Sequence, residues 1–135
     1  VAIHAPITFQ TKFIPFIPLL ETVEKYHVSK PESIVLIRKE ERAAYDAIPL
    51  ASIKELSKLI GQLNLNRITE PTLIMQTKND TIVDLNSATH IYDQIASEDK
   101  KIIWLEDSTH EDPDEKEKIL VFNELYLFIE RNSKP

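Results

Sequence analysis

The second half of the chain alternates short apolar runs with segments of helical periodicity. Compact apolar runs over 71–76 and 101–105 have the length of buried strands, and apolar positions at helical spacing follow them over 86–95 and 113–131. Strand, helix, strand, helix is the order typical of a parallel sheet with crossover helices. The apolar run over 1–5 is short enough for a further buried strand. We therefore predict an α/β fold.

The first half is richer in helical spacing. The pattern predicts a helix over 15–27, and S-x-x-E sequences, which are typical of helix N-termini, predict further helices over 29–46 and from Ser52 onward. The run 33–37 is also compatible with a strand. The helix that starts near Ser52 has one apolar stripe, formed by Ile53, Leu56, Ile60 and Leu63.

These two patterns meet near residues 67–71, where we expect a domain boundary. We expect 1–8 to be a core strand, 9–67 a helical cap or lid, and 68–135 the C-terminal part of the core. The chain begins at Val1 inside an apolar stretch, which leads us to expect a truncated core.

Composition narrows the classes of function. The chain has 135 residues, of which 42% are hydrophobic and 28% charged, as in a soluble globular protein. A net charge of −6 argues against a nucleic-acid partner, and no apolar run approaches the roughly 20 residues that span a bilayer. The absence of cysteine excludes disulfides and thiolate metal sites. Since no secretory leader is visible, we expect a cytoplasmic protein.

Candidate chemistry lies just beyond two predicted strands. Asp80 comes four residues after Gln76, and His110 five residues after Leu105. Loops after the C-terminal ends of parallel strands lie at one edge of a sheet, so both side chains are expected to meet there. Taken separately, Asp80 is an ordinary turn aspartate and His110 an ordinary surface histidine. Their joint placement favours a catalytic acid and histidine.

Two motifs resemble the α/β-hydrolase superfamily. Residues 71–83 (PTLIMQTKNDTIV) resemble the strand and acid loop P-T-L-x-x-x-G-x-x-D-x-x-V, and residues 104–110 (WLEDSTH) resemble the histidine loop W-x-x-x-S-G-H. The small bacterial carboxylesterases related to monoacylglycerol lipases are the most similar family members. Residues 3–6 resemble the core strand that precedes the cap in these enzymes.

The resemblance implies a partial α/β-hydrolase fold and a carboxylic ester hydrolase that uses a Ser-Asp-His triad. Asp80 and His110 would be its acid and histidine, with no cofactor and a small-molecule ester as substrate. None of the eight serines lies in the G-x-S-x-G sequence of a nucleophile elbow. We therefore expect the serine on an upstream segment and predict that this chain alone is inactive.

Some residues depart from the family pattern. Thr77 and Thr109 replace glycines, and Asp84 replaces a frequent proline. Glu111 and Asp112 place negative charge beside the histidine, which favours the charged imidazole and is compatible with a decayed site.

Other side chains have weaker claims. Phe13, Phe16 and Ile17 either line an acyl-chain tunnel or pack the cap against the core. The acidic residues around His110 match no calcium loop, and Asp112 followed by Pro113 is typical of a helix start, so we expect no metal. A non-enzymatic interaction module is the alternative function. In either case the open edge of the first strand is expected to pair with the missing N-terminal half or with another copy.

Overall fold

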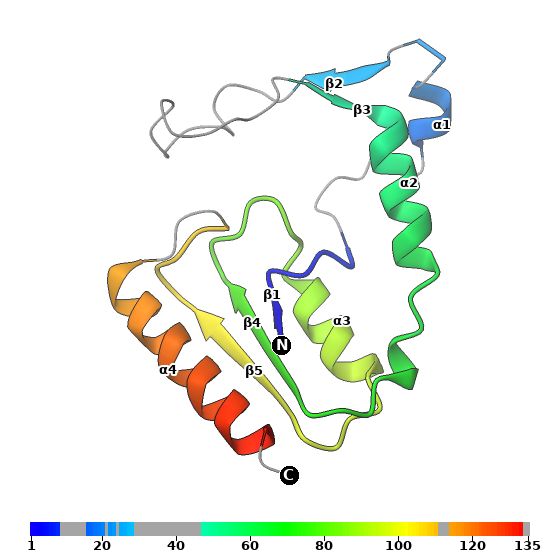
Figure 1. The fold of residues 1–135 in the computed structure, drawn as a ribbon. Coiled ribbons are helices and arrows are strands. Elements are labelled where there is room, and N and C mark those ends of the chain that lie inside the picture. The colour runs from blue at the N-terminus through cyan, green and yellow to red at the C-terminus, as the bar shows by residue number, and fades with distance from the viewer. Residues whose placement is uncertain (9–15, 21, 24, 29–46, 111–113, 134–135) are drawn as a thin grey trace. The chain divides into compact units, whose positions relative to one another are not determined.

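The computed structural model describes residues 1–8, 16–20, 22–23, 25–28, 47–110 and 114–133 (Figure 1). The chain divides into two compact units. The first consists of Val1–Gln10 and Asn64–Pro135, and the second of Thr11–Leu63.

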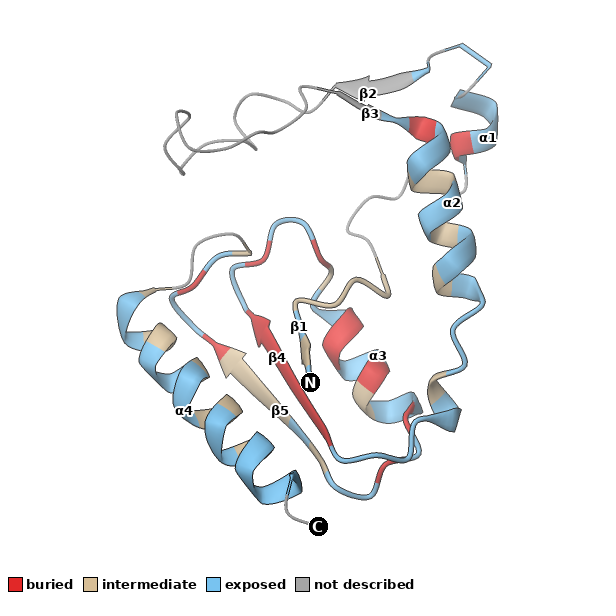
Figure 2. Ribbon diagram, in the orientation of Figure 1, coloured by how far each residue is buried: buried red, intermediate tan, exposed pale blue. Residues whose placement is uncertain are grey.

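The first unit is built on a parallel sheet of three strands. β1 (Ala2–Ile3), β4 (Thr72–Thr77) and β5 (Lys100–Leu105) lie in the order β1-β4-β5, so that β4 is central. Ala2 pairs with Ile74 in β1–β4, and Ile74 pairs with Ile102 in β4–β5. Every residue of β4 is buried (Figure 2), which is typical of a parallel strand covered on both faces. The predicted parallel α/β architecture is therefore confirmed.

Helix α3 (Asn86–Gln94) covers one face of this sheet. Its residues Ala88 and Ile91 form a buried cluster with Ile74 of β4 and with Ile95, which follows the helix. Ile102 and Trp104 of β5 are partly buried against the same cluster. Side chains alternate between the faces of a strand, so Leu73, Met75 and Lys101 point to the opposite face.

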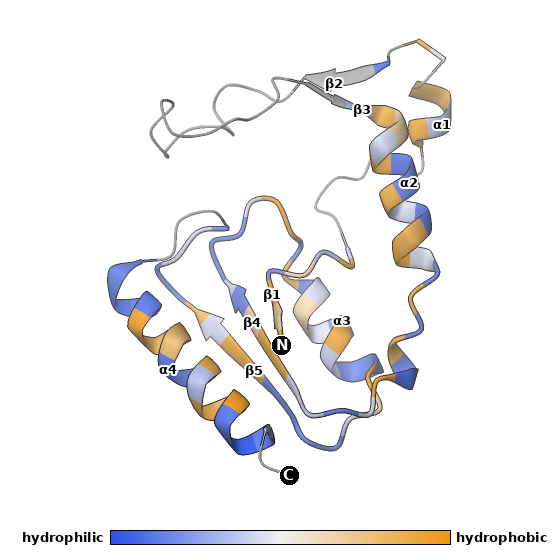
Figure 3. Cartoon of the chain, in the orientation of Figure 1, coloured by the Kyte–Doolittle hydropathy of each residue, from blue (hydrophilic) through white to orange (hydrophobic). Residues whose placement is uncertain are grey.

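Helix α4 (Glu115–Asn132) contacts that opposite face through an ion pair, in which the Lys101 ammonium lies 2.8 Å from the Glu124 carboxylate. None of its residues is fully buried. Hydrophobic residues nevertheless alternate with hydrophilic ones between the two hydrophilic ends of the helix (Figure 3). Several are more than half exposed, among them Ile119, Phe122, Tyr126, Leu127 and Ile129. Nothing in the described residues covers these side chains, whereas Val121, Leu125 and Phe128 of the same helix are partly buried.

The described part of the second unit contains two helices and an antiparallel pair of short strands. β2 (Tyr26–Val28) and β3 (Ala47–Pro49) pair in antiparallel register, with His27 opposite Ile48. β3 leads directly into α2 (Leu50–Gly61). A short helix, α1 (Ile17–Leu20), contacts α2. Back in the first unit, a single 3-10 turn, η3 (Leu65–Arg67), precedes β4.

Three sequence predictions about the helices need correction. The helix expected over 15–27 is only α1, because residues 26–28 pair with β3 as a strand. The helix expected from Ser52 begins earlier, at Leu50, and Ser52 is not its cap. Asp114, and not Asp112, caps α4, since its carboxylate accepts from the Lys116 amide at 2.9 Å. The element expected over 29–46 lies outside the described residues.

No helix in the described part of the chain has both the length and the hydrophobicity needed to cross a membrane.

Candidate active site

Asp80 is fixed by the loop that carries it. The loop follows β4 at the C-terminal edge of the sheet, and the Asp80 side chain has no exposed surface. Its Oδ1 atom accepts hydrogen bonds from the amides of Ile82 at 2.9 Å and Val83 at 2.8 Å. Its Oδ2 atom accepts from the Gln76 side-chain amide at 2.7 Å. These bonds hold the carboxylate in one orientation and satisfy its acceptor sites.

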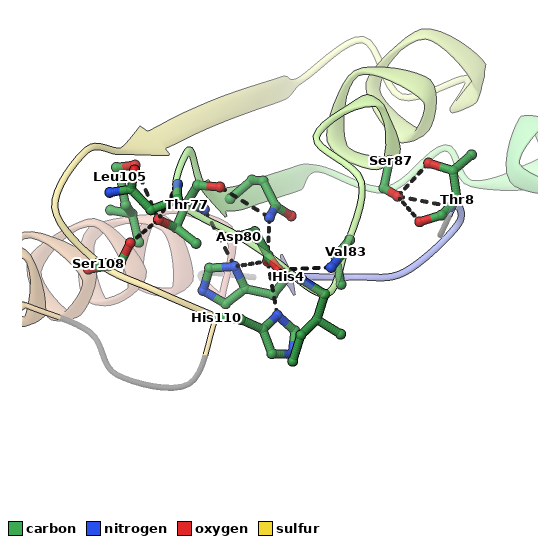
Figure 4. A network of polar contacts seen from close by, with 12 residues as sticks. His4, Thr8, Thr77, Asp80, Val83, Ser87, Leu105, Ser108 and His110 are labelled. Atoms are coloured by element: carbon green, nitrogen blue, oxygen red, sulfur yellow. Dashed lines mark hydrogen bonds and ion pairs between the residues drawn. The ribbon is translucent and has the colours of Figure 1, made fainter. Parts of the chain in front are cut away.

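His110 meets this carboxylate from the next loop. Its Nδ1 atom lies 2.9 Å from Asp80 Oδ2 (Figure 4). The predicted proximity of the two side chains is therefore confirmed. With an ionised carboxylate as acceptor, Nδ1 carries the proton, which leaves Nε2 as the basic nitrogen. The side chain of His110 is 27% exposed, so the imidazole reaches the surface while the carboxylate does not.

The histidine loop is held by a carboxylate from helix α4. Glu117 accepts hydrogen bonds from the amides of Glu106 at 2.5 Å, Asp107 at 3.2 Å and Ser108 at 2.7 Å. It also accepts from the Ser108 hydroxyl. Burial opposes ionisation, but the bonds from Ser108, Glu106 and Asp107 outweigh it and lower the pKa of Glu117. One charged side chain thus fixes three consecutive residues that precede His110.

Three consecutive residues at the end of β4 and the start of the acid loop tie the two loops together. The Thr77 hydroxyl donates to the Ser108 carbonyl, and the Asn79 side-chain amide donates to the Glu106 carbonyl at 2.5 Å. The Lys78 amide donates to the Leu105 carbonyl at 2.8 Å. Thr77 occupies the position where the resemblance expects glycine, and its hydroxyl provides a bond that glycine cannot make.

His4 also belongs to this site. It follows β1, and its amide donates to the Met75 carbonyl at 3.0 Å. Its φ of 48° lies in the left-handed region, which non-glycine residues adopt at a cost of about 1–2 kcal/mol. His4 Nδ1 lies 3.5 Å from Asp80 Oδ2, and the His4 and His110 ring centroids are 5.4 Å apart. Both imidazoles therefore lie against one carboxylate (Figure 4).

The segment after His4 is anchored to the start of α3. The amide of Thr8 donates to the Ser87 hydroxyl oxygen at 2.9 Å, and the amide of Asp84 donates to the Thr8 carbonyl at 3.3 Å. The Ser87 hydroxyl donates to the same carbonyl at 3.0 Å. These contacts fix the direction in which the chain leaves β1.

The surroundings of the two side chains keep Asp80 ionised and His4 neutral. Burial opposes the charge on Asp80, but hydrogen bonds from Val83, His110, Ile82 and Gln76 outweigh it and lower the pKa of Asp80. Burial lowers the pKa of His4, an effect that Asp80 partly offsets and His110 reinforces. A negative acid beside an uncharged second imidazole is the resulting state at neutral pH.

The structure describes only some of the other residues predicted for the site. Phe13, Glu111 and Asp112 lie outside the described residues. Phe16 is 57% exposed, whereas Ile17 is buried within its own unit. His4, Gln76 and Glu117 also belong to the site, although no role was predicted for them. His4 follows a strand at the same edge as Asp80, which was a usable signal, but nothing in the sequence pointed to the other two.

Comparisons with known proteins identify the family. The family model described as serine aminopeptidase, S33, matches residues 6–117. The chain belongs to this family of α/β-hydrolases. A carboxylesterase of Bacillus subtilis is 31% identical over 110 residues, covering 80% of this chain and 43% of that protein. A thermostable monoacylglycerol lipase of Bacillus sp. is 36% identical over 69 residues, covering 50% of this chain and 28% of that protein.

A solved structure agrees with the fold. A structure from work on two metagenome-derived lipolytic enzymes, LipS and LipT, superimposes with a TM-score of 0.73 at 21% identity, covering 95% of this chain and 53% of that chain. The chain thus spans about half of the solved neighbour, and less than half of the two relatives. The structure accordingly contains part of an α/β-hydrolase fold.

Proposed function

We propose that this chain supplies the acid and the histidine of a Ser-Asp-His carboxylic ester hydrolase. The observation that carries the proposal is the 2.9 Å contact between Asp80 Oδ2 and His110 Nδ1 at the C-terminal edge of a parallel sheet. Two buried backbone-to-carboxylate bonds and the Glu117 contacts keep this geometry in place without substrate.

In the proposed reaction, Asp80 holds His110 in the tautomer whose Nε2 is basic. Nε2 removes the proton from a serine hydroxyl as that oxygen attacks the ester carbonyl, and the resulting imidazolium is stabilised by the Asp80 carboxylate. The imidazolium then protonates the departing alcohol, which leaves an acyl-serine. Water activated by the same Nε2 hydrolyses this intermediate and regenerates the enzyme.

The serine nucleophile comes from outside this sequence. Two serines near the site are already engaged: Ser87 hydrogen-bonds Thr8, and Ser108 hydrogen-bonds Glu117. Neither lies in a G-x-S-x-G sequence, whose small neighbours permit the strained turn of a nucleophile elbow. We therefore assign the nucleophile to a segment that pairs with the open edge of β1, where Val1 and Ile3 are 55% and 43% exposed.

The domain assignment follows from this view. We assign 1–8 and 68–135 to the hydrolase core and 9–67 to a cap. Phe13, Phe16 and Ile17 remain the candidate acyl-chain contacts of that cap. The similarity to a carboxylesterase and to a monoacylglycerol lipase favours an ester of a fatty acid as the substrate class.

Hydrolysis of p-nitrophenyl esters tests the proposal. We expect no turnover by this chain alone. We expect turnover by a protein that continues into the reading frame upstream of Val1, and a loss of about 10³-fold or more in kcat on His110→Ala. His90→Ala, which changes an exposed histidine of α3, is the matched control and should leave kcat unchanged.

Two results would contradict the proposal. One is turnover by the isolated chain that His110→Ala does not remove. The other is an extended protein in which both histidine variants retain full activity. Parallel assays with aminoacyl p-nitroanilides separate an esterase from an aminopeptidase. If the extended protein turns over neither substrate while the isolated chain associates with itself, the interaction-module alternative is favoured.

A further inference from the structure

His4, Asp80 and His110 form a cluster of a kind that binds metal ions. Among the described residues, they are the group of histidine and acidic side chains close enough to share an ion, with one ligand atom from each within 4.8 Å of the others. The cluster gathers three elements, since His4 follows β1, Asp80 follows β4 and His110 follows β5. No role in the proposed hydrolysis was assigned to His4.

The spacing of these atoms suits a small tetrahedral ion. Zinc binds histidine nitrogen and carboxylate oxygen at about 2.0–2.2 Å, which puts two ligands of one tetrahedral ion about 3.3 Å apart. His110 Nδ1 and His4 Nδ1 lie 2.9 Å and 3.5 Å from Asp80 Oδ2, on either side of that value. The two imidazole nitrogens are within 4.8 Å of each other. Binding of an ion therefore requires the rings to rotate only far enough to shorten this one distance between ligands.

One contact in the cluster is poorly satisfied without a cation. The Thr77 amide donates to His4 Nδ1 at 3.4 Å, which makes this nitrogen an acceptor in the neutral imidazole. The same nitrogen lies 3.5 Å from Asp80 Oδ2, which is also an acceptor. Two acceptors with no proton between them repel each other, and a bound cation would convert this repulsion into two bonds. The long Thr77 bond is weak and is lost at little cost.

The surroundings of the cluster support a ligand role. Gln76, Ile82 and Val83 hydrogen-bond the Asp80 carboxylate, as outer-shell groups do around metal-bound carboxylates. The His4 and His110 side chains are 16% and 27% exposed, which gives an ion a path from solvent.

We propose that His4, Asp80 and His110 bind a divalent ion of the zinc class through Asp80 Oδ2 and one nitrogen of each imidazole, with the fourth position open to solvent. Two histidines and one carboxylate with an open position are a known ligand set for zinc. The ion would displace the proton that His110 shares with Asp80. Metal binding and hydrolysis would then exclude each other. This consequence rests on the proposed function, whereas metal binding itself does not depend on it.

Zinc titration of the isolated chain tests this site. After treatment with EDTA and its removal, calorimetry at neutral pH should detect one Zn²⁺ per chain. His4→Ala and His110→Ala should each weaken binding by about tenfold or more. His90→Ala is the matched control and should bind like the wild type. Both site variants change partly exposed rings, and their unfolding midpoints in urea are measured alongside to verify that they fold.

A second readout identifies the ligands. Substitution of Zn²⁺ by Co²⁺ should give the intense visible absorption of a four-coordinate ion, and His4→Ala should lose this band. The proposal is overturned if the folded chain binds no zinc at millimolar concentration, or if His4→Ala binds as tightly as the wild type. Zinc binding requires no serine, so this result is independent of the ester assay.

Discussion

The loops that carry Asp80 and His110 leave neighbouring strands at the same edge of the sheet, yet different parts of the chain hold them in place. Asp80 accepts from amides of its own loop, two and three residues further on, and from Gln76 at the end of its own strand. The histidine loop depends on a side chain of α4 and on two side chains of the acid loop. The acid is therefore positioned locally, and the histidine is positioned by tertiary contacts.

We expect the two loops to respond differently when one of their contacts is removed. Loss of the Asp80 carboxylate leaves buried donors without acceptors and should destabilise the whole unit. Loss of one histidine-loop contact should loosen that loop while the acid loop keeps its structure. Substitutions of the residues that hold each loop distinguish these two outcomes.

Asp80→Ala should have the largest effect. The substitution leaves the amides of Ile82 and Val83 without their acceptor and removes the shorter of two bonds from the Gln76 side-chain amide. Each unsatisfied buried donor costs about 1–3 kcal/mol. We expect the free energy of unfolding in urea to fall by about 3 kcal/mol. Asp93→Ala, at an exposed position on α3, is the control and should change it by less than about 0.5 kcal/mol. Equal effects of the two substitutions would contradict the local anchoring of the acid.

Glu117→Ala should have an intermediate and more local effect. It removes the acceptor for three successive amides, and partial exposure of the site limits the cost to about 1–2 kcal/mol. Amide hydrogen exchange should become faster at 106–108 and stay unchanged at Ile82 and Val83. The control is Glu130→Ala, which lies at an exposed position of the same helix. Faster exchange in both loops would mean that they are not held independently.

Thr77→Val should cost about 1 kcal/mol, because it removes one buried hydroxyl donor while keeping the side-chain shape. Thr81→Val changes an exposed threonine of the acid loop and should be neutral. A Thr77→Val protein as stable as the wild type would show that the link between Thr77 and Ser108 contributes nothing to stability.

Acidification should produce the smallest change. The pKa of Glu117 is lower in the folded chain than its ordinary value of 4.5, so the unfolded chain binds the proton more tightly. The stability that Glu117 provides is complete above that value and is lost as the pH falls through the lower, folded pKa. Urea unfolding of the wild type and Glu117→Gln at pH 6 and below pH 4 measures the difference. Identical pH slopes would contradict the charged role of Glu117.

Much of the fold was predictable because the apolar pattern and the packing agree. β4 and β5 are short apolar runs, and α3 has one apolar face at helical spacing. The packing partners of all three lie close in sequence, and their predicted positions are within one or two residues of those observed. The strand over 26–28 was mistaken for helix because Val23 and Tyr26 fit a helical period, whereas pairing with β3 decides the structure. The pairing of β2 with β3 cannot be read from the spacing of apolar residues within 15–27.

The site was predictable only in part for a similar reason. Asp80 and His110 follow strand ends, which sequence spacing reveals. His4 also follows a predicted strand, but only the pairing of β1 with β4 shows that its ring lies against Asp80. Glu117 needed the direction in which α4 crosses the sheet, which no motif in the chain encodes.

The protonation state of the His110 ring shows whether His110 donates a hydrogen bond to Asp80. Nitrogen NMR of the imidazole, recorded near neutral pH with EDTA present, reports which ring nitrogen carries the proton. We predict a proton on Nδ1, protected from exchange by its bond to Asp80, and a basic Nε2. A neutral ring with its proton on Nε2 and no coupling to Asp80 would contradict this prediction.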